Sequence, residues 1–263
     1  MRIPESHRKP YRLGVCLSGG GARGFAHIGA MRALYELGLR PDIVAGVSAG
    51  SVVAAFHGAN MLENSNTLLN LFAGSRFRDF AEIQVPTQAF FSLNRFKDKL
   101  EAIIPYKTIE SLPNPTVICA TDLDNATKMA FSSGPLAERI VASCSIPIIF
   151  EPVTINGRRY VDGGVLRNLP AWAIRHLCDT LIGINCSPFD PAATPAKSII
   201  DIARRSFSVM AKNNVTPDLE LCDLVVSLTE TASHQTFDLS ELEMVVESGY
   251  LTTLRALRSY ALR

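Results

Sequence analysis

The feature that most constrains the fold is a pattern that occurs twice near the N-terminus: an apolar run, a glycine-containing turn and a helix-like period. The first apolar run, 13–17, ends in Ser-Gly-Gly-Gly, and apolar residues at helical spacing follow over 24–37. The second run, 43–45, leads into Gly-Val-Ser-Ala-Gly and then into a helix of small residues that reaches about residue 58. Two such units in succession predict parallel strands joined by helices.

Later segments continue this alternation. Buried strands are predicted at 117–121, 160–161, 180–185 and 224–228, and helices at 171–177, at 199–210 and in an amphipathic stretch that begins near residue 242. Residues 61–113 are less regular. We therefore expect an α/β fold, a three-layer sandwich with a mostly parallel central sheet. Because no linker-like or repetitive tract interrupts the chain, we expect residues 1–263 to form one domain.

Composition limits the classes of partner. The chain has 263 residues, 47% hydrophobic and 19% charged, with a formal net charge of +1, so it can bury a large core and is not typical of disorder. Without a long basic run, no nucleic-acid partner is expected. The N-terminal ten residues lack an apolar signal core, and no apolar run reaches the ~18 residues of a spanning helix. These features favour a cytoplasmic protein and leave open a peripheral contact with a membrane or export by a route that needs no cleavable signal. They do not indicate an oligomeric state.

The cysteines and acidic residues do not indicate a metal site. None of the six cysteines has CxxC or another metal-ligand spacing, and most lie in apolar, strand-like stretches. We interpret them as small buried hydrophobes in a reducing compartment. We therefore expect neither a metal nor a cofactor.

The first glycine turn has the form GxGxxG and allows several interpretations. It comprises Gly19, Gly20, Gly21, Ala22, Arg23 and Gly24. A dinucleotide site would also need an acidic residue at the end of the next strand, but that strand ends in Gly46-Val47-Ser48. Backbone N–H groups of such a loop could instead hold a phosphate or the oxyanion of an acyl-transfer intermediate. The loop could also be a tight turn without a ligand.

The second turn is a GxSxG motif and predicts a nucleophile elbow. Ser48 would sit on a sharp strand-to-helix turn, and Gly46 and Gly50 would leave room for close packing. The chain order does not fit an α/β-hydrolase, because only two strands precede Ser48. Among the five histidines, only His234 is placed like the late histidine of a catalytic triad.

The third motif places Asp162 at the end of a strand, followed by Gly163 and Gly164. Taken alone, this sequence would predict a plain β-turn. Together, the three motifs resemble the patatin-like phospholipase family in order and rough spacing. The resemblance covers nearly the whole chain, in particular to compact bacterial members. Residues 143–152 look like the family's proline-containing loop beside the active site, and 167–170 like the stretch after its aspartate.

The resemblance implies a lipid acyl hydrolase that acts on phospholipid, lysophospholipid or other lipid esters. Ser48 would be the nucleophile and Asp162 the base, and the N–H groups of Gly20, Gly21 and Ala22 would form the oxyanion hole, with Arg23 nearby. A water-poor site could raise the pKa of Asp162 and make it a better base. Two alternatives stay open: a Ser-His-Asp esterase that uses His234, and a nucleotide- or phosphate-binding module that uses the glycine loop.

The irregular segment 61–113 has two interpretations of its own. Six of the thirteen phenylalanines lie between Phe72 and Phe96, with basic residues among them. These basic residues are Arg76, Arg78, Arg95, Lys97 and Lys99. The segment could be a satellite core, or a lid or acyl-chain groove whose basic rim meets lipid phosphates.

Overall fold

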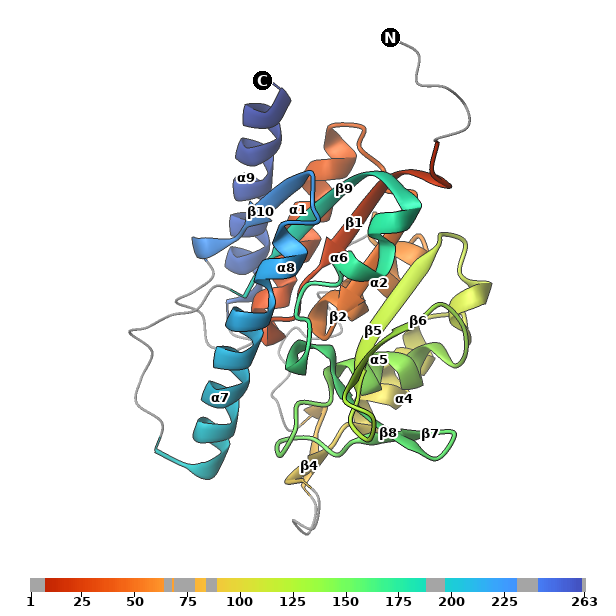
Figure 1. Ribbon diagram of the computed structural model, residues 1–263, viewed down its shortest axis with the longest axis vertical. Coiled ribbons are helices and arrows are strands. Elements are labelled where there is room, and N and C mark those ends of the chain that lie inside the picture. Colours follow the sequence, from red (N-terminus) through yellow and green to blue (C-terminus); the bar gives the residue numbers. More distant parts are fainter. Residues whose placement is uncertain are drawn as a thin grey trace.

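The computed structural model describes residues 8–63, 68, 79–83, 89–187, 197–230 and 241–261 (Figure 1). Within these ranges, an eight-stranded sheet has the order β10-β9-β1-β2-β5-β8-β7, and β6 pairs with β5 outside this path. The strands are β1 (Tyr11–Leu17), β2 (Ile43–Val47), β5 (Thr116–Asp122), β6 (Thr127–Phe131), β7 (Val153–Ile155), β8 (Arg158–Asp162), β9 (Cys178–Asn185) and β10 (Leu224–Ser227).

The sheet is mostly parallel, as predicted. Strands β10, β9, β1, β2 and β5 pair in parallel, whereas β6, β7 and β8 join in antiparallel fashion. Every residue of β2 and β5 is buried, which explains why these strands read as continuous apolar runs. Such burial requires cover on both faces of the sheet.

Helices supply that cover on both faces, so the predicted three-layer architecture is confirmed. Successive residues of one strand enter opposite cores: Val15 and Leu17 of β1 belong to the larger cluster, and Cys16 to the second. The longer helices are α1 (Ala26–Glu36), α2 (Ala49–Gly58), α4 (Asn94–Ile103), α5 (Leu136–Cys144), α7 (Ile199–Asn214) and α9 (Leu242–Ala261). The short helices α6 (Ala171–Ile174) and α8 (Thr216–Leu219) accompany the second core.

Several boundaries differ from the prediction. The helix expected over 24–37 begins as a 3₁₀ turn, η2 (Gly21–Phe25), before α1 starts at Ala26. The helix expected over 171–177 ends in another 3₁₀ turn, η6 (Arg175–Leu177). The described part of 61–113 forms the hairpin of β3 (Glu82–Ile83) and β4 (Phe91–Ser92), then α4 and a 3₁₀ turn, η4 (Ile109–Ser111). None of the helices in the described ranges is both long enough and apolar enough to span a membrane.

Candidate active site

Ser48 occupies a strained turn between β2 and α2. Its backbone angles are φ 52° and ψ −125°, a region that residues with a Cβ rarely adopt. The flanking glycines make the turn possible. A Cβ added at Gly46 would lie 2.2 Å from the Gly50 carbonyl oxygen, and one added at Gly50 would lie 2.4 Å from that of Leu17. The geometry has the form of a nucleophile elbow.

A buried serine from α5 holds this turn in place. The backbone N–H of Ser48 donates to Ser143 Oγ at 2.8 Å, and the Ser143 hydroxyl donates to the Cys119 carbonyl of β5 at 2.6 Å. Ser143 therefore links the elbow to the adjacent strand. The family resemblance places residues 143–152 beside the active site, but no motif predicts that Ser143 contacts the elbow, because nothing in the local sequence indicates a contact with a turn so far away along the chain.

Asp162 ends β8 inside the protein and is fully buried. Its Oδ1 accepts the Gly164 N–H at 2.8 Å, while its Oδ2 has no hydrogen-bond partner in the part of the chain that the structure describes. Burial raises the pKa of Asp162 to about 7, and the neighbouring Ser48 hydroxyl and Gly164 N–H oppose that rise. The fold thus brings the two predicted residues together, with one carboxylate oxygen available for a proton.

The glycine loop forms one wall beside Ser48. Gly21, Ala22 and Gly24 line the same cavity as Ser48. The Gly19 N–H donates to the Asn168 carbonyl at 3.1 Å, so this amide is engaged by the fold itself. Arg23 is buried, and its guanidinium lies 3.5 Å from both the Gly20 carbonyl oxygen and Ser187 Oγ. These contacts indicate that Arg23 stabilises the conformation of the glycine loop.

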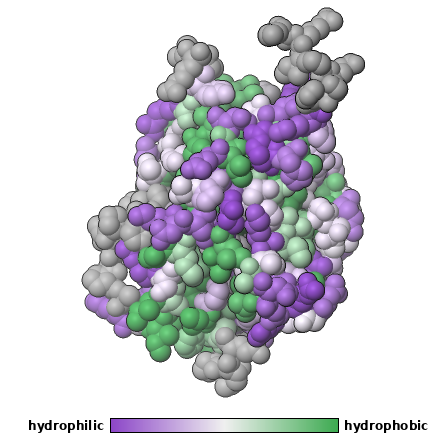
Figure 2. All heavy atoms as spheres, viewed as in Figure 1, coloured by the Kyte–Doolittle hydropathy of each residue, from purple (hydrophilic) through white to green (hydrophobic). Residues whose placement is uncertain are grey.

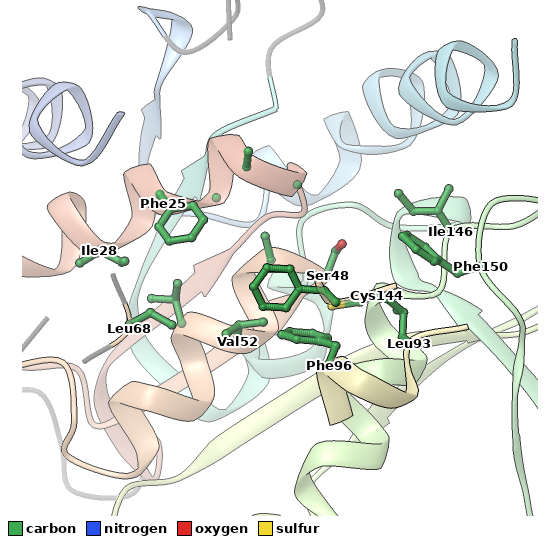
Figure 3. A pocket seen from close by; sticks show the side chains of 16 residues that line it. Phe25, Ile28, Ser48, Val52, Leu68, Leu93, Phe96, Cys144, Ile146 and Phe150 are labelled. Atoms are coloured by element: carbon green, nitrogen blue, oxygen red, sulfur yellow. The ribbon is translucent and has the colours of Figure 1, made fainter. Parts of the chain in front are cut away.

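An apolar cavity of about 150 Å³ opens at Ser48. In Figure 3, Phe25, Ile28, Val52 and Leu68 lie on one side of the serine, and Ile146 and Phe150 on the other. The remaining lining residues are Gly21, Ala22, Gly24, Ala49, Val53, Phe80, Leu93, Phe96 and Cys144. Such a lining suits a hydrocarbon chain better than a polar ligand.

The segment 61–113 contributes Leu68, Phe80, Leu93 and Phe96 to this cavity. Its predicted basic rim is less available than expected. Arg95 pairs with Glu82 at 3.0 Å and Lys97 with Glu101 at 3.8 Å, while Arg76 and Arg78 lie outside the described residues. Lys99 stacks on the Phe80 ring, 4.1 Å from its centroid. The lid interpretation stays a prediction.

The described histidines make other contacts. His27 Nε2 lies 2.8 Å from the Ser18 carbonyl oxygen, and His57 Nδ1 lies 2.6 Å from Tyr35 Oη. His176 lies on η6, and none of these three lines the cavity. His7 and His234 are outside the described residues. No cluster of three or more potential metal ligands occurs in the described ranges.

A sequence model of the patatin-like phospholipase family matches residues 15–174, more than half of the chain. The chain belongs to the patatin-like phospholipase family. The matched region contains the glycine loop, the elbow at Ser48 and the turn at Asp162. The family resemblance drawn from the motifs is therefore confirmed at the level of the family.

Individual patatin-like relatives match over a similar region. An uncharacterized NTE family protein of Mycobacterium tuberculosis is 33% identical over 159 residues, 60% of this chain and 44% of the relative. Lysophospholipase NTE1 of Cryptococcus neoformans is 27% identical over 168 residues, 62% of this chain and 10% of the relative. Thus the matched region is less than half the length of either relative.

The patatin-like fold is also evident in a solved structure. Human GIVD cytosolic phospholipase A2 aligns with a TM-score of 0.53 and 12% sequence identity, covering 98% of this chain and 60% of that chain. At this identity the similarity concerns the fold. The alignment agrees with the mostly parallel sheet covered by helices on both sides.

Proposed function

We propose that this protein is a lipid acyl hydrolase that acts through Ser48 and Asp162. The observation that carries the proposal is the juxtaposition of three features. A serine on a strained elbow lines an apolar cavity, and a buried carboxyl group whose pKa is raised to about 7 lies next to that serine. The combination supplies a nucleophile, a base and a place for an acyl chain.

In the acylation step, Ser48 Oγ attacks the ester carbonyl carbon, and the serine proton passes to Asp162 Oδ2. The N–H groups of Gly20, Gly21 and Ala22 would stabilise the oxyanion of the tetrahedral intermediate. Collapse of this intermediate breaks the ester C–O bond, and Asp162 returns the proton to the leaving alcohol. An acyl-enzyme on Ser48 remains.

In the deacylation step, Asp162 takes a proton from a water molecule that attacks the acyl carbon. The second tetrahedral intermediate collapses, the proton returns to Ser48 Oγ, and the fatty acid leaves. Asp162 acts on the same proton route in both half-reactions, so no further base is needed. The raised pKa of Asp162 reduces the difference between its pKa and that of the serine hydroxyl, which eases proton transfer. Near pH 7 a substantial fraction of Asp162 is still ionised and can accept the proton.

The substrate class follows from the cavity. A wall of aliphatic and aromatic side chains at Ser48 favours the acyl chain of a phospholipid, lysophospholipid or related ester. The printed name of the Cryptococcus relative, a lysophospholipase, agrees with this class. The apolar lining also argues against the alternative of a nucleotide- or phosphate-binding module. The alternative with a histidine base depends on His234.

A fluorophosphonate probe tests the function directly. The purified protein would be treated with the probe and digested, and the adduct located by mass spectrometry. We expect one adduct, on Ser48, that is absent from Ser48→Ala and from heat-unfolded protein. In parallel, a panel of phospholipids, lysophospholipids and neutral esters would be analysed for released fatty acid. Absence of both labelling and fatty-acid release in the folded protein would refute the proposal.

A further inference from the structure

Four isoleucine side chains stand out as exposed at one end of the molecule. Ile83 on β3 is 86% exposed, Ile199 and Ile202 on α7 are 67% and 57% exposed, and Ile148 is 52% exposed. We name these four residues the isoleucine face. In Figure 1, β4, which pairs with β3, and the first turns of α7 lie at the same end of the long axis. Figure 2 shows hydrophobic atoms gathered over this lower part of α7.

Ile148 adds an indication that this exposure has a function. It has φ +72°, a conformation that is unfavourable for a β-branched residue. Two neighbours in the same loop, Ile146 and Phe150, line the candidate acyl cavity. The loop is fastened to β4, because the Phe90 N–H donates to the Ile148 carbonyl at 3.2 Å and the Phe91 N–H to that of Ile149 at 3.0 Å. A strained turn thus exposes an apolar side chain beside the cavity.

Helix α7 has the character of an interfacial helix. Ile199, Ile202, Val209 and Met210 are exposed along it at helical spacing. Cations outnumber anions along this helix. Its one acidic residue is Asp201, whereas its basic residues are Arg204, Arg205 and Lys212, with Lys197 just before its start. An apolar stripe flanked by cations suits a surface with hydrocarbon below and anionic groups above.

The inner face of α7 contacts the catalytic turn. Asn214 Nδ2 donates to the carbonyls of Gly164 and Val165 at 2.8 and 3.1 Å. A Cβ added at Gly164 would lie 2.6 Å from the Phe207 ring, so this ring packs directly on the turn that follows Asp162. The helix that exposes the apolar stripe therefore also supports the turn of the candidate base.

We propose that the isoleucine face docks on an anionic lipid surface and brings the candidate acyl cavity to its substrate. This inference rests on the proposed function, since it gives the lipid esterase access to a bilayer. The side chains would enter the headgroup region, with the cations of α7 at the level of the phosphates. An acyl chain could then pass into the cavity beside Ile148.

Vesicle sedimentation tests this face. The probes are phosphatidylcholine vesicles with and without phosphatidylserine, and the variant is Ile83→Ser/Ile199→Ser/Ile202→Ser, whose positions do not line the cavity. We expect binding to anionic vesicles to weaken by at least about tenfold, because three apolar contacts with the bilayer are lost. Hydrolysis of a short soluble ester should stay at the wild-type rate.

The matched control is Leu37→Ser/Met244→Ser/Leu251→Ser, which removes three other exposed apolar side chains, at the end of α1 and on α9. It should bind vesicles as the wild type does. Equal binding by the isoleucine variant, or failure of the wild type to bind, would overturn the docking proposal. So would a wild type that is dimeric in solution together with a variant that is monomeric, which would identify a self-association surface. If the wild type neither hydrolyses a soluble ester nor reacts with the fluorophosphonate probe, the proposed function is refuted, irrespective of the result for vesicle binding.

Discussion

At the scale of single residues, the proposed chemistry depends on the protonation of Asp162. Burial raises its pKa to about 7, and only the ionised carboxylate can accept the Ser48 proton. We therefore expect kcat/KM on a soluble ester to rise with pH and to reach half its plateau near pH 7. A pH profile between 5 and 9 at constant ionic strength measures this. A rate that is flat across that range would contradict the assignment.

Ser143 is predicted to position the nucleophile without touching the substrate. In Ser143→Ala, the buried N–H of Ser48 loses its acceptor, which should cost roughly 1–3 kcal/mol of stability. The elbow should relax, so kcat should fall at least about tenfold while KM changes little. Ser143→Thr retains the hydroxyl and should recover part of the loss.

Ser145→Ala is the matched control for Ser143. Ser145 is also buried near the end of α5, but its hydroxyl donates to the Val141 carbonyl of the same helix. Its backbone carbonyl, which accepts the Asp162 N–H at 2.9 Å, is kept by the substitution. This variant should retain near wild-type kcat. Equal losses of kcat in the two alanine variants would show that Ser143 has no special role at the elbow.

Site residues that depend on local backbone geometry could be predicted from the sequence, whereas contacts between distant segments could not. Ser48 and Asp162 are recognisable because the glycines around them report backbone geometry that local sequence encodes. The family resemblance includes the segments of Ser143 and Asn168, but the contacts of these residues with Ser48 and Gly19 could not be predicted, since they join distant segments. No local pattern states that a serine of one helix will face a turn from another strand.

At the scale of elements, the crossing of α1 and α9 depends on two glycines. A Cβ added at Gly249 would lie 2.1 Å from the Ala26 carbonyl oxygen, and one added at Gly29 would lie 1.9 Å from that of Val246. We expect Gly249→Ala to lower the free energy of unfolding by about 1–3 kcal/mol, because the helices must separate. In a solvent-exposed helix the same change would raise the free energy of unfolding by roughly 1 kcal/mol. The sign of the measured change therefore shows whether the close approach of α1 and α9 is important for stability.

Urea unfolding of Gly249→Ala measures this effect, with Ser248→Ala as the neighbouring control. Ser248 is half-buried, and its hydroxyl donates to Glu230 at 3.2 Å. This control should stay within about 0.5 kcal/mol of the wild type. A Gly249→Ala protein as stable as the wild type would mean that the two helices can separate at little cost.

The buried strands and the edge strand β10 could be predicted from apolar runs, whereas strand β6 and helix α5 could not. Strands β2 and β5 are covered on both faces and therefore show continuous apolar runs. Strand β6 has a largely exposed sequence, Thr127–Phe131, and is defined by its pairing with β5. Helix α5 has nine residues, too few for periodicity alone to separate it from a buried strand.

At the scale of the whole molecule, two buried groups should act in opposite directions on stability. Burial lowers the pKa of His57 to about 4, so it stays neutral in the folded protein while the unfolded chain takes up a proton below about pH 6.5. The contribution of neutral His57 to the free energy of unfolding is therefore present above pH 6.5 and is lost as the pH falls towards 4. The raised pKa of Asp162 has the opposite sign, because its contribution is lost as the pH rises from about 4 to 7.

Single variants separate these two terms. When the pH is lowered from 7 to 4.5, the free energy of unfolding of His57→Gln should rise by about 2–3 kcal/mol relative to that of the wild type, because the variant has no histidine whose protonation favours the unfolded chain. Asp162→Asn should lose a similar amount over the same interval. Urea titrations at the two pH values measure both differences. Parallel shifts in the two variants would contradict the assigned ionisation states.

The central claim for the molecule is that Ser48 and Asp162 form a complete catalytic pair. The most direct test compares kcat/KM of Ser48→Ala, Asp162→Asn and His234→Ala on one soluble ester, with folding of each variant confirmed by circular dichroism. Because the pair acts as a unit, the first two variants and their double variant should all lose nearly all activity, without additive effects. His234→Ala should retain most of the wild-type activity. A His234→Ala protein as inactive as Ser48→Ala would contradict the account and assign a histidine as the base.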